Sequence, residues 1–588
     1  MGNLRIWAPR AERVVLHAGT HAVPFVPLER GWWTAESPRI APGTDYRLAL
    51  DDHPPIPDPR SPWQPQGLEG PSRVLDHARF RWSDHGWQAR PLSSGIVYEL
   101  HVGTFSREGT FAGVEAHLDQ LRALGITHLE LMPVNCFAGR RGWGYDGANL
   151  FAPHAAYGSP DDLKHLVDTC HARGLAVILD VVYNHLGPAG NYLDWFGPFF
   201  TDHYRTPWGR AVNFDGPDSA EVRRFFCDNA RMWLRDYHFD GLRLDAVHAM
   251  YDFSARHFLE QLAAEVRELE IELGRSLVLI AESDLNDPRV IRSPELGGYG
   301  VHAQWSDDFH HALHQVLTGE RNGYYADFNG LDDLAKALRR AFVYDGRFSR
   351  ERRRPHGRTP AGITGDRFLG YIQNHDQVGN RARGERIARL AGAERAKMAA
   401  ALVLTSPFVP MLFQGEEWGA SAPFQYFTDF PDRALGRAVR DGRRREFAAF
   451  GWDPEEIPDP QDPRTFERSR LDWAERDQEP HRSMLAWYTR LIRLRAEMPA
   501  LRNGRFDRMR VDADAASGRL VVQRPPVAVA CNFARAPQVV SLPENRWRIL
   551  LSSHGQARAG STHVELPAES VAILTGEAGD AAPGEVVN

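Results

Sequence analysis

The stretches LAVILDVVYNH at residues 175–185 and GLRLDAVH at residues 241–248 decide the fold of this chain. Each is an apolar run of strand length that closes on polar side chains, and helical sequence separates the two. Buried strands that alternate with helices form a parallel sheet or barrel whose strands are covered on both faces. The two stretches therefore indicate parallel strands with polar side chains gathered at their carboxyl ends.

Six further runs of strand length extend this pattern in both directions. They lie at residues 96–103, 126–134, 277–283, 300–308, 367–376 and 407–417. Amphipathic segments such as 159–174 and 218–238 separate several of them, as βα units require. Eight strands alternating with helices predict an α/β fold, a (β/α)8 TIM barrel.

Short strands broken by Pro and Gly flank the barrel on both sides. Residues 1–92 predict an N-terminal β-sandwich of the carbohydrate-binding-module or immunoglobulin-like kind. The barrel should occupy residues 93–505, with a short insertion at about 186–220 after the third strand. Residues 506–576 predict a C-terminal antiparallel β-domain, and residues 577–588 have too little to bury and are predicted to be disordered.

The charge and hydropathy patterns exclude several kinds of partner. The chain has 588 residues and a formal net charge of −7, so it lacks the basic field that nucleic-acid binding needs. Two Arg-rich stretches, 347–358 and 437–445, are interrupted by acidic, Gly or Pro residues and are expected to be solvated. No run reaches the roughly 18 apolar residues of a membrane helix, and the N-terminus does not resemble a secretory signal. We expect a cytoplasmic protein, a monomer or weak homo-oligomer, with neither nucleic acid nor membrane as a partner.

The cysteines argue against a structural zinc site. Cys136, Cys170, Cys227 and Cys531 include no CxxC pair, which fits a reducing compartment and buried free thiols. The insertion at about 186–220 also lacks a cluster of acidic residues suited to calcium. We therefore expect no metal and no cofactor.

Carboxylates at strand ends are the candidate reacting groups, because barrel enzymes build their sites there. Asp245, Glu282 and Asp376 each close one of the predicted strands, and Asp180 and Asn184 close another. A single charged residue in an apolar strand is most simply a structural ion pair, because burying it unpaired is costly. Several carboxylates delivered to one barrel mouth favour catalysis instead.

The local spacing separates the roles of two of these carboxylates. Arg243 and Asp245 lie two residues apart on one strand, so they share a face, and the guanidinium should keep Asp245 ionised as a nucleophile requires. Glu282 follows the apolar run VLIA without a neighbouring cation in sequence, which favours the neutral acid that can protonate a leaving oxygen. Glycoside hydrolysis requires such a pair.

Histidines and aromatic residues near the strand ends are candidates to bind sugar. His185 and His375 stand beside the carboxylates, although a lone histidine is as often structural. Aromatic side chains that flank strand ends and offer flat faces for a sugar ring are Trp143, Tyr145, Trp208 and Trp418. Most of the sixteen tryptophans must still serve packing.

The motifs that carry these residues resemble the four signature regions of the α-amylase superfamily of glycoside hydrolases. They are DVVYNH (180–185), GLRLDAVH (241–248), the strand that carries Glu282, and QNHD (373–376). The resemblance covers residues 93–505, and both flanking regions are similar to β-domains found in that superfamily.

The resemblance implies retaining chemistry with three working carboxylates. Asp245 would be the nucleophile, Glu282 the general acid/base and Asp376 the stabiliser of the transition state. Retention requires the two reacting carboxyl groups to lie about 5 to 5.5 Å apart. The substrate-binding residues that we expect around them are Tyr145, His185, Arg243, His248, His375, Trp143, Trp208, Asp284, Gln377 and Trp418. For Asp284 two roles stay open, orienting the acid or capping the next helix.

Longer stretches resemble one group within the superfamily. These are YELHVGTFSREGTF (98–111), RGWGYDGANLFAPHAAYGSPDDLKHLV (141–167), HYRTPWGRAVNFDGP (203–217) and GLRLDAVHAM (241–250). The resemblance implies hydrolysis of the α-1,4 bond next to the terminal trehalose unit of maltooligosyltrehalose, with related α-glucans as further partners. A glycogen-branching or debranching enzyme is the alternative within the superfamily. A non-catalytic glycan-binding protein is the alternative from another class, disfavoured because all three carboxylates are present.

Overall fold

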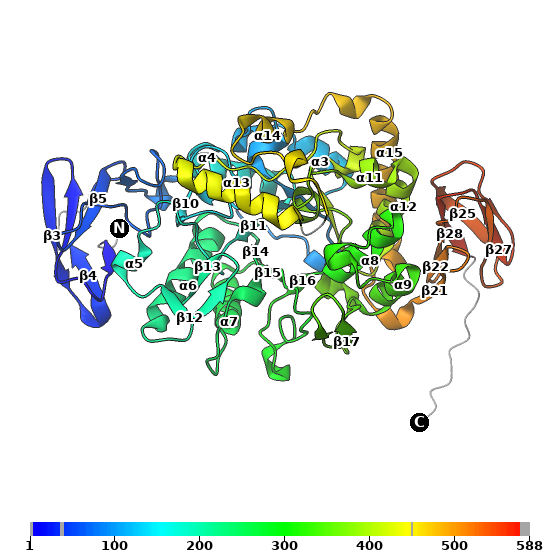
Figure 1. The fold of residues 1–588 in the computed structure, drawn as a ribbon, viewed down its shortest axis with the longest axis horizontal. Coiled ribbons are helices and arrows are strands. Elements are labelled where there is room, and N and C mark those ends of the chain that lie inside the picture. Colours follow the sequence, from blue (N-terminus) through cyan, green and yellow to red (C-terminus); the bar gives the residue numbers. More distant parts are fainter. Residues whose placement is uncertain (1–3, 36–39, 449–450, 577–588) are drawn as a thin grey trace.

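A closed barrel of eight parallel strands forms the centre of the computed structural model, which describes residues 4–35, 40–448 and 451–576. The strands are β7 (Val97–Leu100), β8 (His128–Leu131), β11 (Ala176–Val181), β14 (Gly241–Leu244), β15 (Val278–Ala281), β16 (Ala303–Trp305), β19 (Phe368–Gly370) and β20 (Val409–Phe413). Each lies inside one of the eight predicted runs, so the predicted fold class is confirmed (Figure 1).

The strand register gathers charged side chains inside the barrel. Glu99 on β7 pairs with Glu130 on β8, and Asp180 on β11 pairs with Arg243 on β14. All four residues are buried. Because burial of a charge is costly unless it is paired or used, this layer marks the part of the barrel where function is to be sought.

Amphipathic helices cover the outside of the barrel. The longer ones are α4 (Pro160–Ala172), α6 (Ser219–Asp236), α7 (Phe258–Leu273), α8 (Asp307–Thr318), α12 (Ala393–Thr405) and α15 (His481–Glu497). Helix α4 begins at a reciprocal capping box formed by Ser159 and Asp162. Helix α3 (Leu118–Leu124) ends at Gly125, whose φ of 101° needs glycine and breaks the helix before β8.

Several barrel strands are shorter than predicted. The run at 367–376 ends as a strand at Gly370, and its polar end forms helix α10 (His375–Gly379) instead. The cause is the side chain of Asn374, which accepts the backbone N–H of Gln377 at 2.7 Å and caps the new helix. The run at 300–308 likewise stops being a strand at Trp305 and enters α8.

Antiparallel sheets lie at the two ends of the molecule (Figure 1). The strands predicted as an N-terminal sandwich join in one six-stranded sheet. In spatial order these are β1 (Arg5–Trp7), β4 (Trp32–Ala35), β3 (His21–Pro27), β2 (Val14–Ala18), β5 (Asp45–Leu50) and β6 (Ser72–Arg73). Residues 577–588, predicted to be disordered, lie outside the described residues.

The C-terminal strands form two sheets that share one apolar cluster. The five-stranded sheet consists of β21 (Arg510–Asp514), β22 (Arg519–Arg524), β23 (Val527–Asn532), β28 (Ser570–Gly576) and β25 (Trp547–Ser552). The other consists of β24 (Gln538–Ser541), β27 (His563–Leu566) and β26 (Arg558–Ala559).

Three segments outside the barrel core bear on the predictions. The expected insertion contains α5 (Leu193–Phe196) and a hairpin of β12 (Phe200–Thr206) and β13 (Gly209–Val212). The Arg-rich stretch at 347–358 spans the hairpin of β17 (Asp345–Ser349) and β18 (Arg354–Gly357), and that at 437–445 lies in α13 (Arg433–Ala448).

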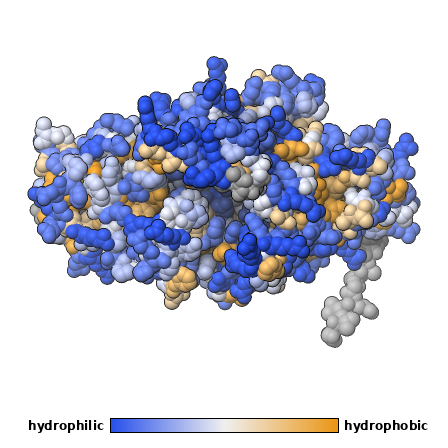
Figure 2. Space-filling model, in the orientation of Figure 1, coloured by the Kyte–Doolittle hydropathy of each residue, from blue (hydrophilic) through white to orange (hydrophobic). Residues whose placement is uncertain are grey.

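The surface is polar where the barrel helices meet solvent. Figure 2 shows that hydrophilic residues cover most of one face, with apolar patches mainly toward the two ends. None of the helices in the described part of the chain has the length and apolar character that crossing a bilayer would require. The four cysteines are free and buried, as predicted.

Candidate active site

Arg243 is the centre of a buried group of carboxylates at the end of β14. Its Nη1 lies 2.7 Å from Asp180 Oδ2 and 2.9 Å from Asp245 Oδ1, and its Nη2 lies 2.7 Å from Glu282 Oε2. The guanidinium carbon is 4.1 Å from the centre of the Trp305 ring, which closes the space around it. One fully buried cation therefore contacts three carboxylates at once.

Glu282 has a cation beside it in space, although none neighbours it in sequence. Arg243 reaches it from the adjacent strand, where the register pairs Arg243 with Ile280, two residues before Glu282. The contact depends on strand pairing between residues distant in sequence, so the local pattern around Glu282 could not reveal it. The backbone N–H of Ala246 also donates to the same oxygen, Oε2, at 2.8 Å.

Asp245 is held from the opposite side by Asn184. The amide Nδ2 of Asn184 donates to Asp245 Oδ2 at 2.6 Å and to the backbone carbonyl of Asp245 at 2.8 Å. Directly after Asp245 the chain turns sharply, because Ala246 adopts a left-handed conformation with φ 39°. This turn brings the Ala246 N–H to Glu282 and so links the two carboxylates through the backbone.

His375 completes a second network that leads back to Arg243. Its Nδ1 lies 2.5 Å from Glu99 Oε1, and its backbone N–H donates to Glu99 Oε2 at 2.9 Å. Burial alone lowers the pKa of His375, but the charges of Glu99 and Asp376 outweigh it and raise the pKa to about 9. As an imidazolium, His375 donates from Nε2 to the Tyr145 hydroxyl at 2.8 Å, which in turn donates to Asp180 at 2.6 Å.

Asp180 lies where the two networks meet. Burial raises the pKa of Asp180 to about 7, although Arg243 acts against it. The charged form of Asp180 is therefore less favoured than that of a surface aspartate. It is a buried carboxylate that positions Arg243 and Tyr145.

Asp376 is more open than the carboxylates around Arg243. It lies on α10, and its Oδ1 is 3.5 Å from His375 Nε2 and 3.1 Å from Asn380 Nδ2. The side chain is 35% exposed, whereas those of Asp245 and Glu282 are 10% and 16% exposed. Asp376 can therefore reach solvent or a ligand while His375 holds it at the rim of the network.

His185 and Trp208 form a stacked pair beside the site. Their rings lie parallel within 7°, with centroids 4.5 Å apart. Burial lowers the pKa of His185 to about 4, so its imidazole is neutral. Trp208 follows β12 in the hairpin turn and is 49% exposed, which leaves one indole face open. An open indole face beside polar hydrogen-bonding groups is suited to a sugar ring.

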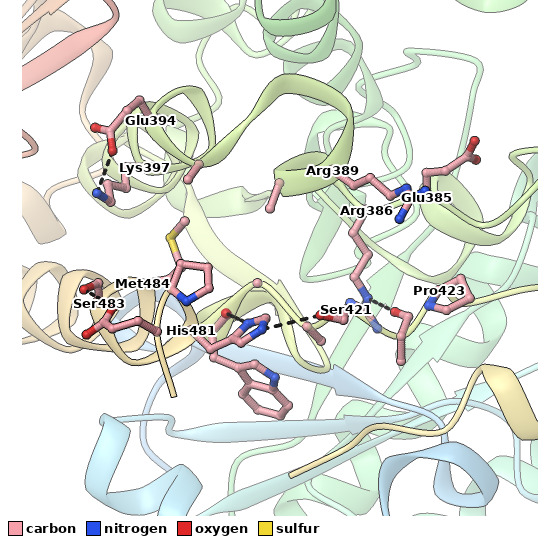
Figure 3. A pocket seen from close by; sticks show the side chains of 18 of the residues that line it. Glu385, Arg386, Arg389, Glu394, Lys397, Ser421, Pro423, His481, Ser483 and Met484 are labelled. Atoms are coloured by element: carbon pink, nitrogen blue, oxygen red, sulfur yellow. Dashed lines mark hydrogen bonds and ion pairs between the residues drawn. The ribbon is translucent and has the colours of Figure 1, made fainter. Parts of the chain in front are cut away.

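Trp143 and Trp418 do not offer such a face. Trp143 is 4% exposed, donates to the backbone carbonyl of Gln425 and packs edge-on against His375. Trp418 is 1% exposed and donates to Glu475. It lines a separate cavity of about 650 Å³ together with His481 and Met484, which are labelled in Figure 3. The structure does not bring Trp418 to the carboxylates.

The remaining predicted residues lie around this centre with other contacts. Asp284 forms an ion pair with Arg352 at 3.1 Å, which is neither of its two expected roles. Burial raises the pKa of Asp284, but the neighbouring His248 and Arg352 outweigh burial and lower it overall. Gln377 lies on α10, 3.5 Å from the Tyr325 hydroxyl. His248 is half-buried, and its Nδ1 has no hydrogen-bond partner within the described part of the chain.

Four residues of the site received no role from the sequence. Asp180 and Asn184 were visible at a strand end, and Glu99 is a carboxylate inside an apolar strand, so the rule that pointed to Asp245 also applies to it. Asn380 carries no such signal. Within residues 4–35, 40–448 and 451–576, no cluster of three or more His, Cys, Asp or Glu side chains is arranged to hold a metal ion.

The chain resembles known proteins over nearly its whole length. The family model described as "Alpha amylase, catalytic domain" matches residues 77–200, and a model of a domain of unknown function matches residues 504–573. The malto-oligosyltrehalose trehalohydrolase of Arthrobacter ramosus is 50% identical over 574 residues, 97% of this chain and 98% of the relative. That of Rhizobium sp. (strain M-11) is 47% identical over 583 residues, 97% of each chain.

More distant matches share less of the chain or only its fold. A 1,4-α-glucan branching enzyme of Photobacterium profundum is 36% identical but covers 40% of this chain and 36% of its own. The crystal structure of a Salmonella typhimurium protein named as an α-amylase superposes with a TM-score of 0.89 at 39% identity, covering 97% of both chains. A pullulanase from Anoxybacillus sp. LM18-11 reaches a TM-score of 0.73 at 18% identity, covering 98% of this chain and 86% of its own, and shares the fold alone.

Proposed function

The chain belongs to the malto-oligosyltrehalose trehalohydrolase family of α-amylase-type glycoside hydrolases, and from this premise we propose how its residues carry out the reaction. It hydrolyses the α-1,4-glucosidic bond next to the terminal trehalose unit of maltooligosyltrehalose and releases trehalose. The branching-enzyme alternative rests on a relative that matches 40% of the chain, whereas trehalohydrolases match 97%.

We propose a retaining double displacement with Asp245 and Glu282 as the reacting pair. Asp245 attacks the anomeric carbon of the glucose on the non-trehalose side, and Glu282 protonates the glycosidic oxygen so that trehalose leaves. Glu282 then deprotonates a water molecule, which hydrolyses the glycosyl ester on Asp245. The observation that carries this proposal is the Arg243 guanidinium, which touches Asp245 with Nη1 and Glu282 with Nη2.

The shared guanidinium fits the movement of charge in this reaction. In the first step Asp245 loses its negative charge to the new bond, while Glu282 gains one as it gives up its proton. Both carboxylates lie next to the Arg243 guanidinium. Arg243 therefore faces one negatively charged carboxylate of this pair before the step and one after it. A fixed cation that needs little reorganisation is the kind of electrostatic stabilisation that lowers a barrier.

The contacts also suggest which Glu282 oxygen carries the catalytic proton. Oε2 accepts the Ala246 N–H and lies 2.7 Å from the positively charged Arg243 Nη2, so in the neutral acid the proton belongs on Oε1. We propose that Oε1 faces the glycosidic oxygen. Asp245 presents Oδ1 to Arg243 and Oδ2 to the amide of Asn184, so its carboxylate is held from both oxygens.

Asp376 and the histidines would bind the reacting glucose. The partly exposed Asp376 carboxylate can accept hydrogen bonds from sugar hydroxyls and stabilise positive charge on the ring, and the buried imidazolium of His375 orients it from beneath. The open face of Trp208, backed by His185, is proposed as a stacking surface for a neighbouring glucose. Related α-glucans would bind through the same surfaces.

The stereochemistry of the first product tests this mechanism. Incubation with maltooligosyltrehalose should release trehalose together with a shortened maltooligosaccharide whose new reducing end is first α, seen by rapid proton NMR. Glu282→Gln and Asp245→Asn should each lower kcat by about 10³-fold or more. Asp194→Asn, which removes a surface partner of Arg210, is the control and should leave kcat unchanged. An initial β-anomer would contradict the retaining mechanism.

A further inference from the structure

Asp376 is the most exposed of the three proposed working carboxylates, and it is carried by the short helix α10. We propose that Asn380 and Arg443 are positioning residues that hold the Asp376 carboxylate toward the reacting sugar. Arg443 lies on α13, outside the barrel strands. The inference rests on the proposed role of Asp376 and adds two residues that act through it.

Asn380 contacts Asp376 from one helical turn further along. Its side-chain Nδ2 donates to Asp376 Oδ1 at 3.1 Å, and its backbone N–H donates to the Asp376 carbonyl at 2.8 Å. His375 Nε2 lies 3.5 Å from the same oxygen. Both side-chain contacts fall on Oδ1, so they leave Oδ2 as the oxygen that can turn to a sugar hydroxyl. The amide restrains the carboxylate without adding a charge to it.

Arg443 decides which end of the Asn380 amide faces Asp376. Its Nη2 donates to Asn380 Oδ1 at 2.9 Å. A guanidinium has donors only, so it must pair with the amide oxygen, and the NH2 end is thereby turned toward Asp376. If the amide were reversed, two acceptor oxygens would face each other. Arg443 therefore maintains a donor beside Asp376.

Arg443 is itself firmly held at this place. The same Nη2 donates to the Gly379 carbonyl at the end of α10, at 2.7 Å. Its guanidinium carbon lies 4.8 Å from the centre of the Tyr426 ring and 4.3 Å from that of Phe447, between two aromatic faces. Tyr426 in turn packs edge-on against Trp143, the residue behind His375. Helix α13 is thus connected to the wall of the active site.

The predicted solvation of the Arg-rich stretch 437–445 does not describe Arg443. It is half-buried and bonded to α10, whereas Arg437 on the same helix is exposed. This difference within one helix provides a matched pair for experiment. It also explains why a charge run in sequence gives no indication of the contact.

Kinetics with maltooligosyltrehalose test the two residues separately. Asn380→Ala should lower kcat about 10-fold and leave KM within about 2-fold, because the lost hydrogen bond serves the transition state more than binding. Asn380→Asp should lower kcat about 100-fold, because it replaces the donor by a second carboxylate next to Asp376. Arg443→Met should lower kcat about 5-fold, Arg443→Lys should restore part of the rate because an ammonium can still donate to Asn380 Oδ1, and Arg437→Ala should match the parent enzyme.

A double variant distinguishes positioning from general support of the fold. If Arg443 acts through Asn380, the variant carrying both Asn380→Ala and Arg443→Met should be no slower than Asn380→Ala alone. The proposal that Arg443 acts through Asn380 would be wrong if the two reductions in kcat multiplied in the double variant. It would also be wrong if each reduction in kcat accompanied a lower Tm. Asp376→Asn separates the two levels of the proposal. If Asp376→Asn is inactive while the Asn380 variants keep the parental kcat, the positioning role of Asn380 and Arg443 is wrong. If Asp376→Asn is fully active, the proposed role of Asp376 is wrong instead.

Discussion

Glu99 and His375 are joined twice, from the side chain and from the backbone, although 275 residues lie between them in sequence. Glu99 Oε1 contacts the imidazole Nδ1 at 2.5 Å, and Oε2 accepts the His375 backbone N–H at 2.9 Å. The carboxylate thus fixes both the direction of the ring and the start of α10. It also keeps the ring charged, because it is the largest influence that raises the pKa of His375, which reaches about 9 despite burial.

Glu99→Gln should move the alkaline limb of the kcat profile to lower pH. The imidazolium exists below the pKa of His375, which is raised to about 9, so removing the Glu99 charge lets the ring lose its proton earlier. The stability that His375 contributes is present below its unfolded pKa of about 6.5 and is lost as pH rises through about 9. The variant should therefore lose this alkaline change in Tm. Glu115→Gln, which removes the partner of the exposed His165, is the control, and an unchanged limb in Glu99→Gln would contradict the assignment.

Arg243→Lys should nearly abolish turnover without loss of charge. A lysine ammonium is a point charge and cannot present two nitrogens to Asp245 and Glu282 as the planar guanidinium does. We expect kcat to fall by about 10³-fold, and the free energy of unfolding to fall by about 3 kcal/mol because buried carboxylates lose a partner. Assays of released trehalose at fixed times measure kcat, and denaturant titration measures the free energy of unfolding. Arg231→Lys, at a surface pair with Glu272, is the control, and a Lys variant that retains rate would rule out the shared-cation mechanism.

Trp208→Ala should weaken substrate binding more than it slows the chemical step. The indole offers an open face next to His185 and, among the described residues, forms no hydrogen bond with Asp245 or Glu282. Loss of a stacking surface should raise KM about 10-fold, and kcat should stay within about 3-fold. Trp195→Ala is a matched control, because Trp195 also stacks on a histidine, His53, and is 36% exposed. Equal effects of the two variants would count against a sugar-binding role.

Gly379→Ala should damage the site through packing alone. A Cβ at Gly379 would lie 2.1 Å from two carbons of the Trp143 ring, and that ring is buried and hydrogen-bonded to Gln425. Since the indole cannot move freely, α10 must shift, and we expect a loss of about 2 kcal/mol in unfolding free energy with a lower kcat. Gly555→Ala has open space around the new Cβ and serves as the control. A Gly379→Ala enzyme with parental Tm and kcat would show that α10 tolerates displacement.

The barrel could be predicted because its strands are buried on both faces. Such strands appear in the sequence as continuous apolar runs, and Asp245 and Glu282 stand out as carboxylates at the ends of those runs. Strand ends were less predictable. The polar end of the 367–376 run looks like a continuing strand, although Asn374 caps a new helix there.

Contacts between residues distant in sequence could not be predicted from local sequence patterns. The cation beside Glu282 comes from the neighbouring strand through the register, which no spacing within the Glu282 run encodes. Trp418 flanks a strand end just as Trp208 does, yet one indole packs inward and the other stays open. Asn380 depends on an arginine from α13, more than sixty residues further along, so its importance appears only when the helices are placed.

The backbone hydrogen bonds between β14 and β15 limit which parts of this enzyme can change without altering the spacing of its buried carboxylates. Arg243 and Asp245 belong to one strand end and Glu282 to the next, so the spacing of the proposed reacting groups is set by the pairing of the two strands. Trp208 and Arg352, by contrast, belong to the β12–β13 and β17–β18 hairpins outside it. Exchange of the β12–β13 hairpin would therefore change the proposed stacking surface for glucose and leave the strand pairing that spaces Asp245 and Glu282 unchanged.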